Sequence, residues 1–453
     1  MKENKFPKGF IWGAATSSYQ IEGAWDKDGK GLSVWDTYSH VPGKTKNNDT
    51  GDIACDHYNR WRGDITLMKK IGLKSYRFSI SWPRIFPDGK GAPNEKGAAF
   101  YDRLIEGLLE AGIEPMITLF HWDLPQGLMD RGGWLNREIT DDFMKYASFA
   151  FKRYGKRVKK WATFNEPWVF TLMAYTSTWQ PPLGINNDYE AGLTAVHNMN
   201  LAHAKAVRAF RELGLNGEIG IVQVSIPAVP EAQDKGTLKK ASILDGIINR
   251  WFLDPLFFGE YPADISEYYR KKYSAVFIPS GADMRLIKDM GTDFVGVNNY
   301  FPFRVKDNGA KKPFDWKECV IRKKNVPRSD MDWEIYPEGI YRILKSYSER
   351  YGNPVMYITE NGNAFKDRII KDGMVMDNDR ISYMREHLKQ ALRAVKEGVD
   401  LRGYYLWSLM DNFEWNHGYS KRFGIIRVDY KTLKRSIKKS GYWYGKVIKE
   451  NGI

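Results

Sequence analysis

Short apolar runs alternate along the chain with longer segments in which apolar residues recur at helical spacing. The apolar runs predict eight strands, at residues 10–13, 75–80, 116–120, 161–164, 219–224, 294–297, 355–359 and 403–407. The intervening segments predict helices, most clearly at residues 64–71, 101–110, 143–154, 189–213 and 381–397. Each of these helical segments stops within two residues of a glycine, as helices commonly do.

This alternation indicates an α/β protein, because strands that alternate with helices pack as a parallel sheet covered by helices. Eight such strands with right-handed crossovers close most naturally into a (β/α)8 or TIM barrel. With 453 residues, the chain has room for extended βα loops. No linker or low-complexity tract interrupts the pattern, so we expect a single domain over residues 1–453.

Polar and aromatic side chains of unusual type gather at or beyond the carboxyl ends of the predicted strands. In TIM barrels the chemistry takes place at that end. A random scatter would be unlikely to produce such a grouping, so we expect a functional pocket formed by these side chains. They are Gln20, Arg77, His121, Asn165, Glu166, Asn298, Tyr300, Glu360, Trp407 and Glu414.

Two of these residues, Glu166 and Glu360, end the fourth and seventh predicted strands, which face each other roughly across a barrel. Cleavage of a glycosidic bond needs such a pair, one carboxylic acid to protonate the leaving oxygen and one carboxylate to attack or to activate water. A single glutamate at a strand end could equally be an ion-pair partner or a helix cap. Two of them beside Asn165, Arg77 and Tyr300 favour catalysis.

Composition supports a sugar site and argues against other partners. The 16 Trp, 26 Tyr and 23 Phe provide aromatic platforms for the flat C–H faces of sugars. The net charge of +14 includes basic clusters at residues 152–160 and 434–439. No nucleic-acid-binding motif accompanies them, so a solvated lysine-rich exterior is expected and no nucleic-acid partner.

Neither a membrane nor a metal site is indicated. No apolar stretch approaches the length of about 20 residues that spans a bilayer, and no apolar leader follows Met1. The two cysteines, Cys55 and Cys319, suit neither a zinc nor a redox spacing and predict reduced thiols in a cytoplasmic protein. His197 and His203 lie six residues apart, on different faces of one predicted helix. We therefore expect no metal ion and no cofactor.

The chain resembles glycoside hydrolase family 1 over nearly its whole length. The motifs that carry the resemblance are specific, and they lie at residues 10–16, 19–23, 76–82, 121–125, 163–167, 358–362 and 407–415. The resemblance implies a retaining, double-displacement mechanism with Glu166 as general acid/base and Glu360 as nucleophile. Arg77 and Tyr300 are expected to hold Glu360 ionised, and the charge of Glu360 to keep Glu166 protonated.

The resemblance also implies sugar subsites. It places Gln20, His121, Asn165, Glu360, Trp407 and Glu414 around the glycone, with Trp415 beside them. Trp333 resembles the outer stacking residue for the aglycone, and Trp168 is expected at the entrance. Tyr300 and Phe423 are further expected contacts with the substrate, and Trp122 and Asn298 are expected to support the site. Departures from the family pattern at Asn299 and at residues 174–184 put the aglycone preference in doubt.

Glu414 favours unphosphorylated glucosides over 6-phospho-glucosides. Relatives that act on the phosphorylated substrates usually carry a serine there, with a lysine and a tyrosine downstream. This chain has Glu414, Lys421 and Phe423 instead, and a carboxylate repels a phosphate dianion. A β-glucosidase with side activity on β-galactosides and β-fucosides is the main hypothesis. A 6-phospho-β-glucosidase and a non-catalytic sugar-binding relative remain alternatives, and the enzyme is expected as a monomer or homo-oligomer.

Overall fold

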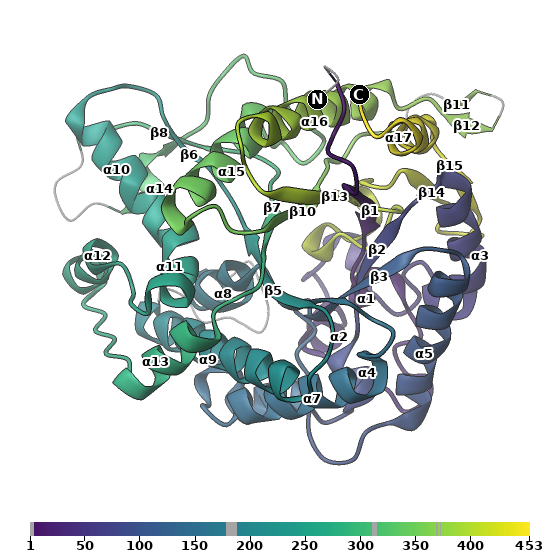
Figure 1. Ribbon diagram of the computed structural model, residues 1–453, viewed down its shortest axis with the longest axis horizontal. Helices are drawn as coiled ribbons and strands as arrows, with labels where there is room; N and C mark the ends of the chain where they lie inside the picture. The colour runs from purple at the N-terminus through teal and green to yellow at the C-terminus, as the bar shows by residue number, and fades with distance from the viewer. Residues whose placement is uncertain (1–3, 178–187, 310–314, 368–369, 372) are drawn as a thin grey trace.

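The computed structural model describes residues 4–177, 188–309, 315–367, 370–371 and 373–453. At its centre, eight parallel strands close into a barrel in the order β1-β13-β10-β7-β5-β4-β3-β2 (Figure 1). This confirms the predicted (β/α)8 barrel, and every predicted strand is present with ends shifted by at most two residues. The strands are β1 (Ile11–Ala15), β2 (Ser75–Ser79), β3 (Glu114–Phe120), β4 (Lys160–Asn165), β5 (Glu218–Val224), β7 (Val295–Asn298), β10 (Met356–Asn361) and β13 (Leu401–Trp407).

Helices surround the barrel and follow its strands in turn (Figure 1). The predicted helices are confirmed at their carboxyl ends, but several begin earlier, because their first turns carry polar residues that hide the apolar period. The main outer helices are α3 (His57–Ile71), α5 (Glu95–Glu110), α7 (Ile139–Tyr154), α9 (Tyr189–Glu212), α11 (Trp251–Phe258), α13 (Gly281–Met290), α15 (Glu338–Tyr351), α16 (Asn378–Lys396) and α17 (Lys439–Glu450).

The barrel strands are buried on both faces, as parallel strands are when helices cover them. Every residue of β2, β7 and β10 is buried. One apolar cluster fills the barrel interior and includes Met116, Ala162, Val222 and Tyr405. The same cluster continues upward to Tyr300 and Trp407, so the barrel core leads directly into the end where the predicted site residues gather.

Extended loops after the barrel strands carry additional short elements that the sequence pattern did not reveal. They include the three-stranded sheet β6-β8-β9 and the two-stranded sheets β11-β12 and β14-β15. Their bounds are β6 (Ala228–Pro230), β8 (Phe303–Val305), β9 (Val320–Ile321), β11 (Ile370–Lys371), β12 (Met374–Val375), β14 (Ile426–Val428) and β15 (Arg435–Ile437). Among the described helices, none combines the length and apolar character that crossing a bilayer requires.

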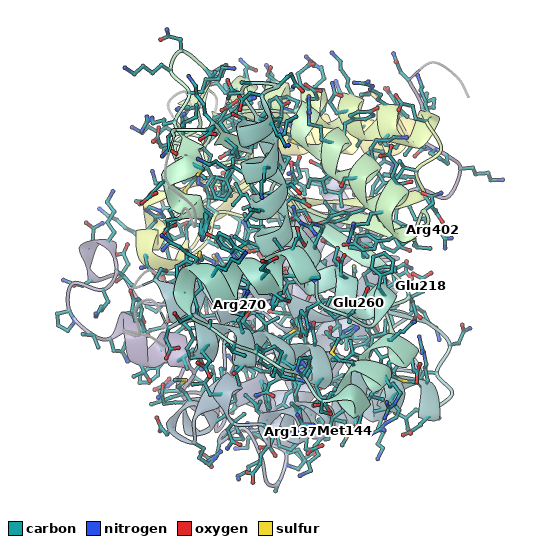
Figure 2. The ribbon with its side chains drawn as sticks, turned by 90° about the vertical axis from the view of Figure 1, so that its left-hand side faces the viewer. Arg137, Met144, Glu218, Glu260, Arg270 and Arg402 are labelled. Atoms are coloured by element: carbon teal, nitrogen blue, oxygen red, sulfur yellow. The ribbon has the colours of Figure 1, made fainter. Side chains whose placement is uncertain are left out.

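The two ends of the barrel differ in chemistry. At the amino ends of the strands, ion pairs join different strands. The carboxylate of Glu114 lies 2.9 Å from the Lys160 ammonium, and Glu218 lies 3.8 Å from the guanidinium of Arg402. Figure 2 shows Glu218 and Arg402 close together at one edge of the molecule. The carboxyl ends of the strands surround a pocket instead.

Gly362 follows β10 at a point where the backbone of Trp407 leaves no room for a side chain. A β-carbon at this position would lie 1.6 Å from the carbonyl oxygen of Trp407. We therefore expect Gly362→Ala to lower the free energy of unfolding by about 1–3 kcal/mol or more, as overpacking does. Gly63→Ala is the matched control, because the space around Gly63 in α3 is open, and it should raise stability by up to about 1 kcal/mol. Denaturant unfolding measures both, and equal stability of the two variants would contradict this account.

Candidate active site

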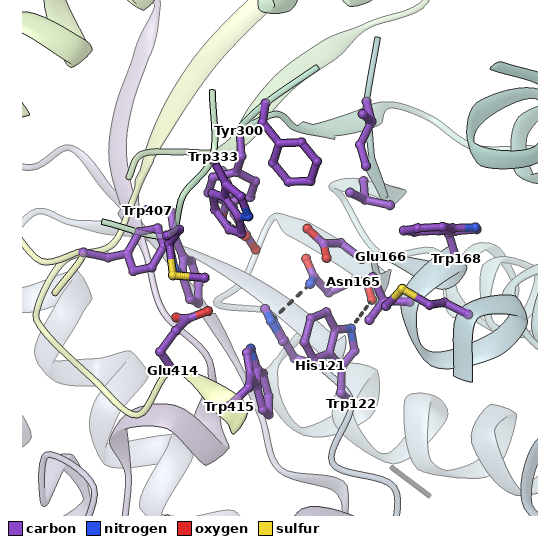
Figure 3. A pocket seen from close by; sticks show the side chains of 18 of the residues that line it. His121, Trp122, Asn165, Glu166, Trp168, Tyr300, Trp333, Trp407, Glu414 and Trp415 are labelled. Carbon is purple, nitrogen blue, oxygen red and sulfur yellow. Dashed lines mark hydrogen bonds between the residues drawn. The ribbon is translucent and has the colours of Figure 1, made fainter. Parts of the chain in front are cut away.

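A pocket of about 370 Å³ opens at the carboxyl ends of the barrel strands. This volume falls within the range of small-molecule sites, roughly 300–1,000 Å³. Figure 3 shows Glu414 and Trp407 on one side of the pocket and Glu166 and Trp168 on the other. The lining residues are His121, Trp122, Asn165, Glu166, Trp168, Val169, Met173, Val224, Ile226, Tyr300, Phe301, Phe303, Met331, Trp333, Glu360, Trp407, Glu414, Trp415, His417 and Phe423.

The two predicted carboxylates line this one pocket, but they are held differently. Glu360, within β10, accepts a 2.6 Å hydrogen bond from Arg77 on one carboxylate oxygen and a 2.5 Å bond from the Tyr300 hydroxyl on the other. Glu166, directly after β4, accepts one 2.8 Å bond from the amide of Asn298. Glu360 therefore has donors on both oxygens, one of them cationic, whereas Glu166 has one neutral donor.

Asn165 and Asn298 connect the two carboxylates. The Asn165 side-chain oxygen accepts a 2.7 Å bond from Arg77 and a 3.0 Å bond from the amide nitrogen of Asn298. Asn298 is itself held by the hydroxyl of Thr359, which donates to its oxygen at 2.8 Å. A side-chain hydrogen bond from Asn298 also lowers the pKa of Glu360. The network thus fixes the position of both carboxyl groups from behind the pocket.

The electrostatic environment favours a proton on Glu166. Burial, followed by the charge of Glu360, raises the pKa of Glu166 to about 8. Burial also raises the pKa of Glu360, whereas the charge of Arg77 and the hydroxyl of Tyr300 lower it. Arg77 and Tyr300 thus act on Glu360 in the expected direction, towards the ionised form, although burial outweighs both in the net shift of its pKa. A proton on Glu360 would displace the hydrogen bond from either Arg77 or Tyr300. When the two glutamates share one proton, Glu166 therefore holds it.

Three residues that line the pocket have left-handed backbone conformations that side chains other than glycine rarely adopt. Their φ angles are 77° for Trp122, 51° for Glu166 and 49° for Trp415. Such conformations cost of order 1–3 kcal/mol each and gather at functional sites. Each of these residues lies at a turn that follows a strand or begins a short helix, and the turn directs its side chain into the pocket (Figure 3).

Aromatic rings form much of the pocket wall. The His121 ring is nearly parallel to the rings of Trp407 and Trp415, at centroid distances of 5.8 and 6.2 Å. On another side, Trp333 lies 5.4 Å from the ring of Tyr300 and 6.0 Å from that of Phe423. These surfaces suit the apolar faces of a sugar or of an aromatic aglycone.

Two polar atoms of the pocket wall are buried without a hydrogen-bond partner in the described structure, namely Nδ1 of His121 and one carboxylate oxygen of Glu414. Burial lowers the pKa of His121 well below its usual value, so its ring is neutral. Burial, followed by the charge of Glu360, raises the pKa of Glu414 to about 8, and a hydrogen bond with Gln20 opposes this shift. Unsatisfied buried groups are costly, and a polar ligand in the pocket would satisfy both.

Comparison with known proteins agrees with this geometry. The model described as glycosyl hydrolase family 1 matches residues 2–453. The chain belongs to this family. It is 48% identical to β-glucosidase A of Thermotoga maritima over 100% of both chains, and 49% identical to the 1,4-β-D-glucan glucohydrolase of Thermotoga neapolitana over 99% of both. A structure of the Thermotoga maritima β-glucosidase in complex with deoxynojirimycin matches with a TM-score of 0.93 and 48% identity, over 99% of this chain and 100% of that one.

Within this family 1 chain, most of the predicted site residues meet in one pocket, and three of them lie behind its wall. Arg77 and Asn298 contact the carboxylates from there. Gln20 donates through its amide to the carbonyl of Phe413 at 2.8 Å and to Asn412 at 3.1 Å. The Gln20 amide nitrogen is therefore held close to Glu414 by the chain segment that precedes it.

The sequence departs from the family pattern at Asn299 and at residues 174–184. The Asn299 side chain donates to the carbonyl of Ser225 at 2.7 Å and is not among the residues that line the pocket, so an effect of this departure on the aglycone would have to be indirect. In the segment 174–184, residues 178–184 lie outside the described residues.

Several lining residues were missed by the sequence analysis. Phe301 and Phe303 lie one and three residues after Tyr300, and this proximity to a predicted site residue was the available signal. His417 lies three residues after Glu414, within a short 3-10 helix (Trp415–Ser420). Its backbone amide donates to the Glu414 carbonyl at 2.9 Å. Within the described residues, no group of three or more His, Cys, Asp or Glu is arranged to hold a metal ion.

Proposed function

We propose that this chain is a retaining β-glucosidase that hydrolyses terminal non-reducing β-D-glucosyl residues of oligosaccharides and of aryl or alkyl glucosides. The observation that carries the proposal is the unequal pair of carboxyl groups, Glu166 and Glu360, in one aromatic pocket of a family 1 barrel. The names of the two Thermotoga relatives support the same activity.

In the first step, Glu360 attacks the anomeric carbon and forms a glycosyl ester, while the bond to the leaving oxygen breaks. Glu166 gives its proton to that oxygen, which departs as the alcohol. As the ester forms, Glu360 loses its negative charge, and its hydrogen bonds from the Tyr300 hydroxyl and from Arg77 weaken. Asn165, which lines the pocket beside both groups, is placed to hydrogen-bond the sugar 2-hydroxyl.

In the second step, the charge of Glu360 is absent because it is esterified. The pKa of Glu166 then falls, and Glu166 takes a proton from water as that water attacks the anomeric carbon. The ester bond breaks, Glu360 regains its charge, and glucose leaves with its original anomeric configuration.

The shared amide of Asn298 supports retention. It hydrogen-bonds Glu166 and also lowers the pKa of Glu360 by hydrogen bonding. Asn298 therefore lies close to both carboxyl groups, which favours a short separation between them. Retaining enzymes place their carboxyl groups about 5–5.5 Å apart, whereas inverting enzymes need roughly 6.5–9.5 Å to admit a water molecule.

Glucose recognition is proposed to rest on the unsatisfied atoms of the pocket. The free oxygen of Glu414 and Nδ1 of His121 would bind sugar hydroxyls, and Gln20 and Trp415 would complete the set, with Trp407 stacking against the ring. Because Glu414 can meet either orientation of the 4-hydroxyl, β-galactosides and β-fucosides are expected as secondary substrates. Trp168, Trp333 and Phe423 are proposed to contact the aglycone, with Trp122 supporting His121.

A chromogenic aryl β-glucoside and its 6-phosphate test the proposal directly. We expect turnover of the glucoside, with the 6-phosphate poorly accepted because the acidic Glu414 side chain offers a phosphate dianion no compensating positive charge. Turnover of the phosphate alone would favour a 6-phospho-β-glucosidase. No turnover of any glycoside would favour a non-catalytic sugar-binding protein. Proton NMR of the first sugar released should show the β anomer.

Glu414→Ser should reverse part of this preference. Loss of two side-chain hydrogen bonds to the sugar, about 0.5–1.5 kcal/mol each, predicts that kcat/KM for the aryl glucoside falls by roughly 5- to 150-fold. Removal of the acidic side chain should at the same time raise the relative activity on the 6-phosphate. Steady-state kinetics on both substrates measure the change, with Glu338→Ser as the control, because Glu338 lies in the first turn of α15 with a partly exposed carboxylate and does not line the pocket. Equal losses on both substrates would contradict the proposed role.

We further propose a cytoplasmic enzyme that takes part in breakdown of cellulose-derived oligosaccharides. The thiols of Cys55 and Cys319 are unpaired and buried, which suits a reducing compartment. The similarity to the 1,4-β-D-glucan glucohydrolase of Thermotoga neapolitana supports oligosaccharides of this class as substrates.

A further inference from the structure

We propose that a second groove, beside the mouth of the active site, binds a β-glucan oligosaccharide without cleaving it. The groove has a volume of about 490 Å³ and lies between the first half of α16 and residues 327–337, with Phe365 also in its wall. Helices α15 and α16 lie side by side at the top of Figure 1. The inference rests on the proposed function for the identity of the sugar.

One wall of the groove is a single face of α16. Asp379, Ser382 and Glu386 all line the groove, and their spacing of three and four residues places them on the same side of the helix. Asp379 and Ser382 are exposed, and Glu386 is partly so. The Glu386 carboxylate lies 2.8 Å from the ammonium of Lys389, which is on the same helix. This face therefore offers a row of hydrogen-bonding groups to a ligand.

The opposite wall comes from the segment that leads into α15. Arg328 lines the groove and is held in place by bonds to the carbonyls of Asp332, at 2.7 Å, and Lys323, at 3.0 Å. Phe365 is partly exposed, with its ring 6.1 Å from that of the buried Tyr383. An aromatic ring between two walls of planar polar groups matches the alternating C–H faces and hydroxyl edges of a sugar chain.

Charge in the groove argues for a neutral ligand. Three carboxylates, those of Asp330, Asp379 and Glu386, line it together with the two cations Arg328 and Lys366. This near balance contrasts with the net charge of +14 for the whole chain. A polyanion would meet a carboxylate on each wall, whereas a glucan would find donors and acceptors on both.

The groove and the catalytic pocket share one hairpin. An antiparallel bridge pairs Arg328 with Glu334, and the residues between them turn at the top of the barrel. Met331 and Trp333 of this hairpin line the catalytic pocket, whereas Arg328 and Asp330 line the groove. An oligosaccharide in the groove would therefore rest against the back of the segment that carries the proposed aglycone residue Trp333, and it would hold long substrates near the entrance.

Calorimetric titration of the full-length Glu360→Gln protein with cellotetraose tests the proposal, because this variant binds sugar without consuming it. We expect two binding events. The double variant Asp379→Ala/Glu386→Ala in the same background should lose about tenfold or more in the affinity of one event only. Lys389→Gln is the matched control, since Lys389 lies on the same helix, pairs with Glu386 and does not line the groove.

Kinetics separate this inference from the proposed function. In the otherwise natural protein, Asp379→Ala/Glu386→Ala should leave kcat/KM for a chromogenic aryl β-glucoside within about twofold, because neither residue touches the catalytic pocket. A single binding event, or two events that the double variant leaves unchanged, would overturn the second site even if the enzyme hydrolyses glucosides normally. Failure of the protein to hydrolyse any glucoside would instead overturn the proposed function.

Discussion

Glu360→Gln is expected to lower kcat for aryl β-glucosides by on the order of 10⁵- to 10⁶-fold, because the variant lacks the group that forms the glycosyl ester. Glutamine occupies nearly the same volume and can still accept a hydrogen bond from the Tyr300 hydroxyl. It leaves the buried guanidinium of Arg77 without its anionic partner, so some loss of stability is expected as well. Steady-state kinetics on a chromogenic glucoside measure the rate, and thermal unfolding shows that the variant is folded.

Glu218→Gln is the control for this substitution. Glu218 also lies on a barrel strand and also accepts a tyrosine hydroxyl, from Tyr357 at 2.9 Å. However, it lies at the amino end of β5, beside Arg402 and away from the pocket (Figure 2). The activity of the Glu218→Gln variant should remain close to that of the natural protein. If purified Glu360→Gln, free of natural enzyme, turned over substrate at a near-normal rate, Glu360 would not be the nucleophile.

The pH dependence of kcat/KM is expected to fall at alkaline pH with a midpoint near the pKa of Glu166, about 8. The first step needs Glu166 protonated, so activity is present below this pKa and is lost as the pH rises through it. On the acidic side, activity should fall as Glu360 takes up a proton. Glu166→Gln should remove the alkaline decline and lower the rate for glucosides with poor leaving groups by about 10²- to 10⁴-fold.

Glu414 provides the decisive control for this profile, because burial raises its pKa to about 8 as well. Glu414→Gln should weaken binding of the sugar and keep the alkaline decline, since Glu414 transfers no proton. Rates measured from acidic to alkaline pH on one activated and one poor leaving group distinguish the two glutamates. Persistence of the alkaline decline in Glu166→Gln would assign it to another group.

The barrel could be predicted from sequence because each of its strands is an apolar run buried on both faces. Such runs have sharp ends, as at β2 (Ser75–Ser79), where the prediction exceeded the strand by one residue. The short strands β6, β8 and β9 could not be predicted in this way. They lie in loops outside the barrel, have only two or three residues each, and are fixed by contacts between distant parts of the chain.

The site could be predicted in its reactive groups but less well in its energetics. Glu166 and Glu360 stand at strand ends and within motifs that the sequence displays. The balance of effects on the pKa of Glu360 could not be predicted, because a sequence shows the cation of Arg77 but not the extent of burial that opposes it. Likewise, the place of Gln20 behind the wall depends on its bonds to Asn412 and Phe413, nearly 400 residues away in the chain.

The central claim is that Glu360 becomes covalently attached to the sugar while Glu166 moves the proton. In Glu166→Gln, an activated aryl β-glucoside should still form the glycosyl ester, but its hydrolysis should slow because no general base remains. Mass spectrometry of the rapidly quenched and digested variant should then find one added glucosyl unit on the peptide that contains Glu360. A glucosyl unit on any other residue would contradict the account.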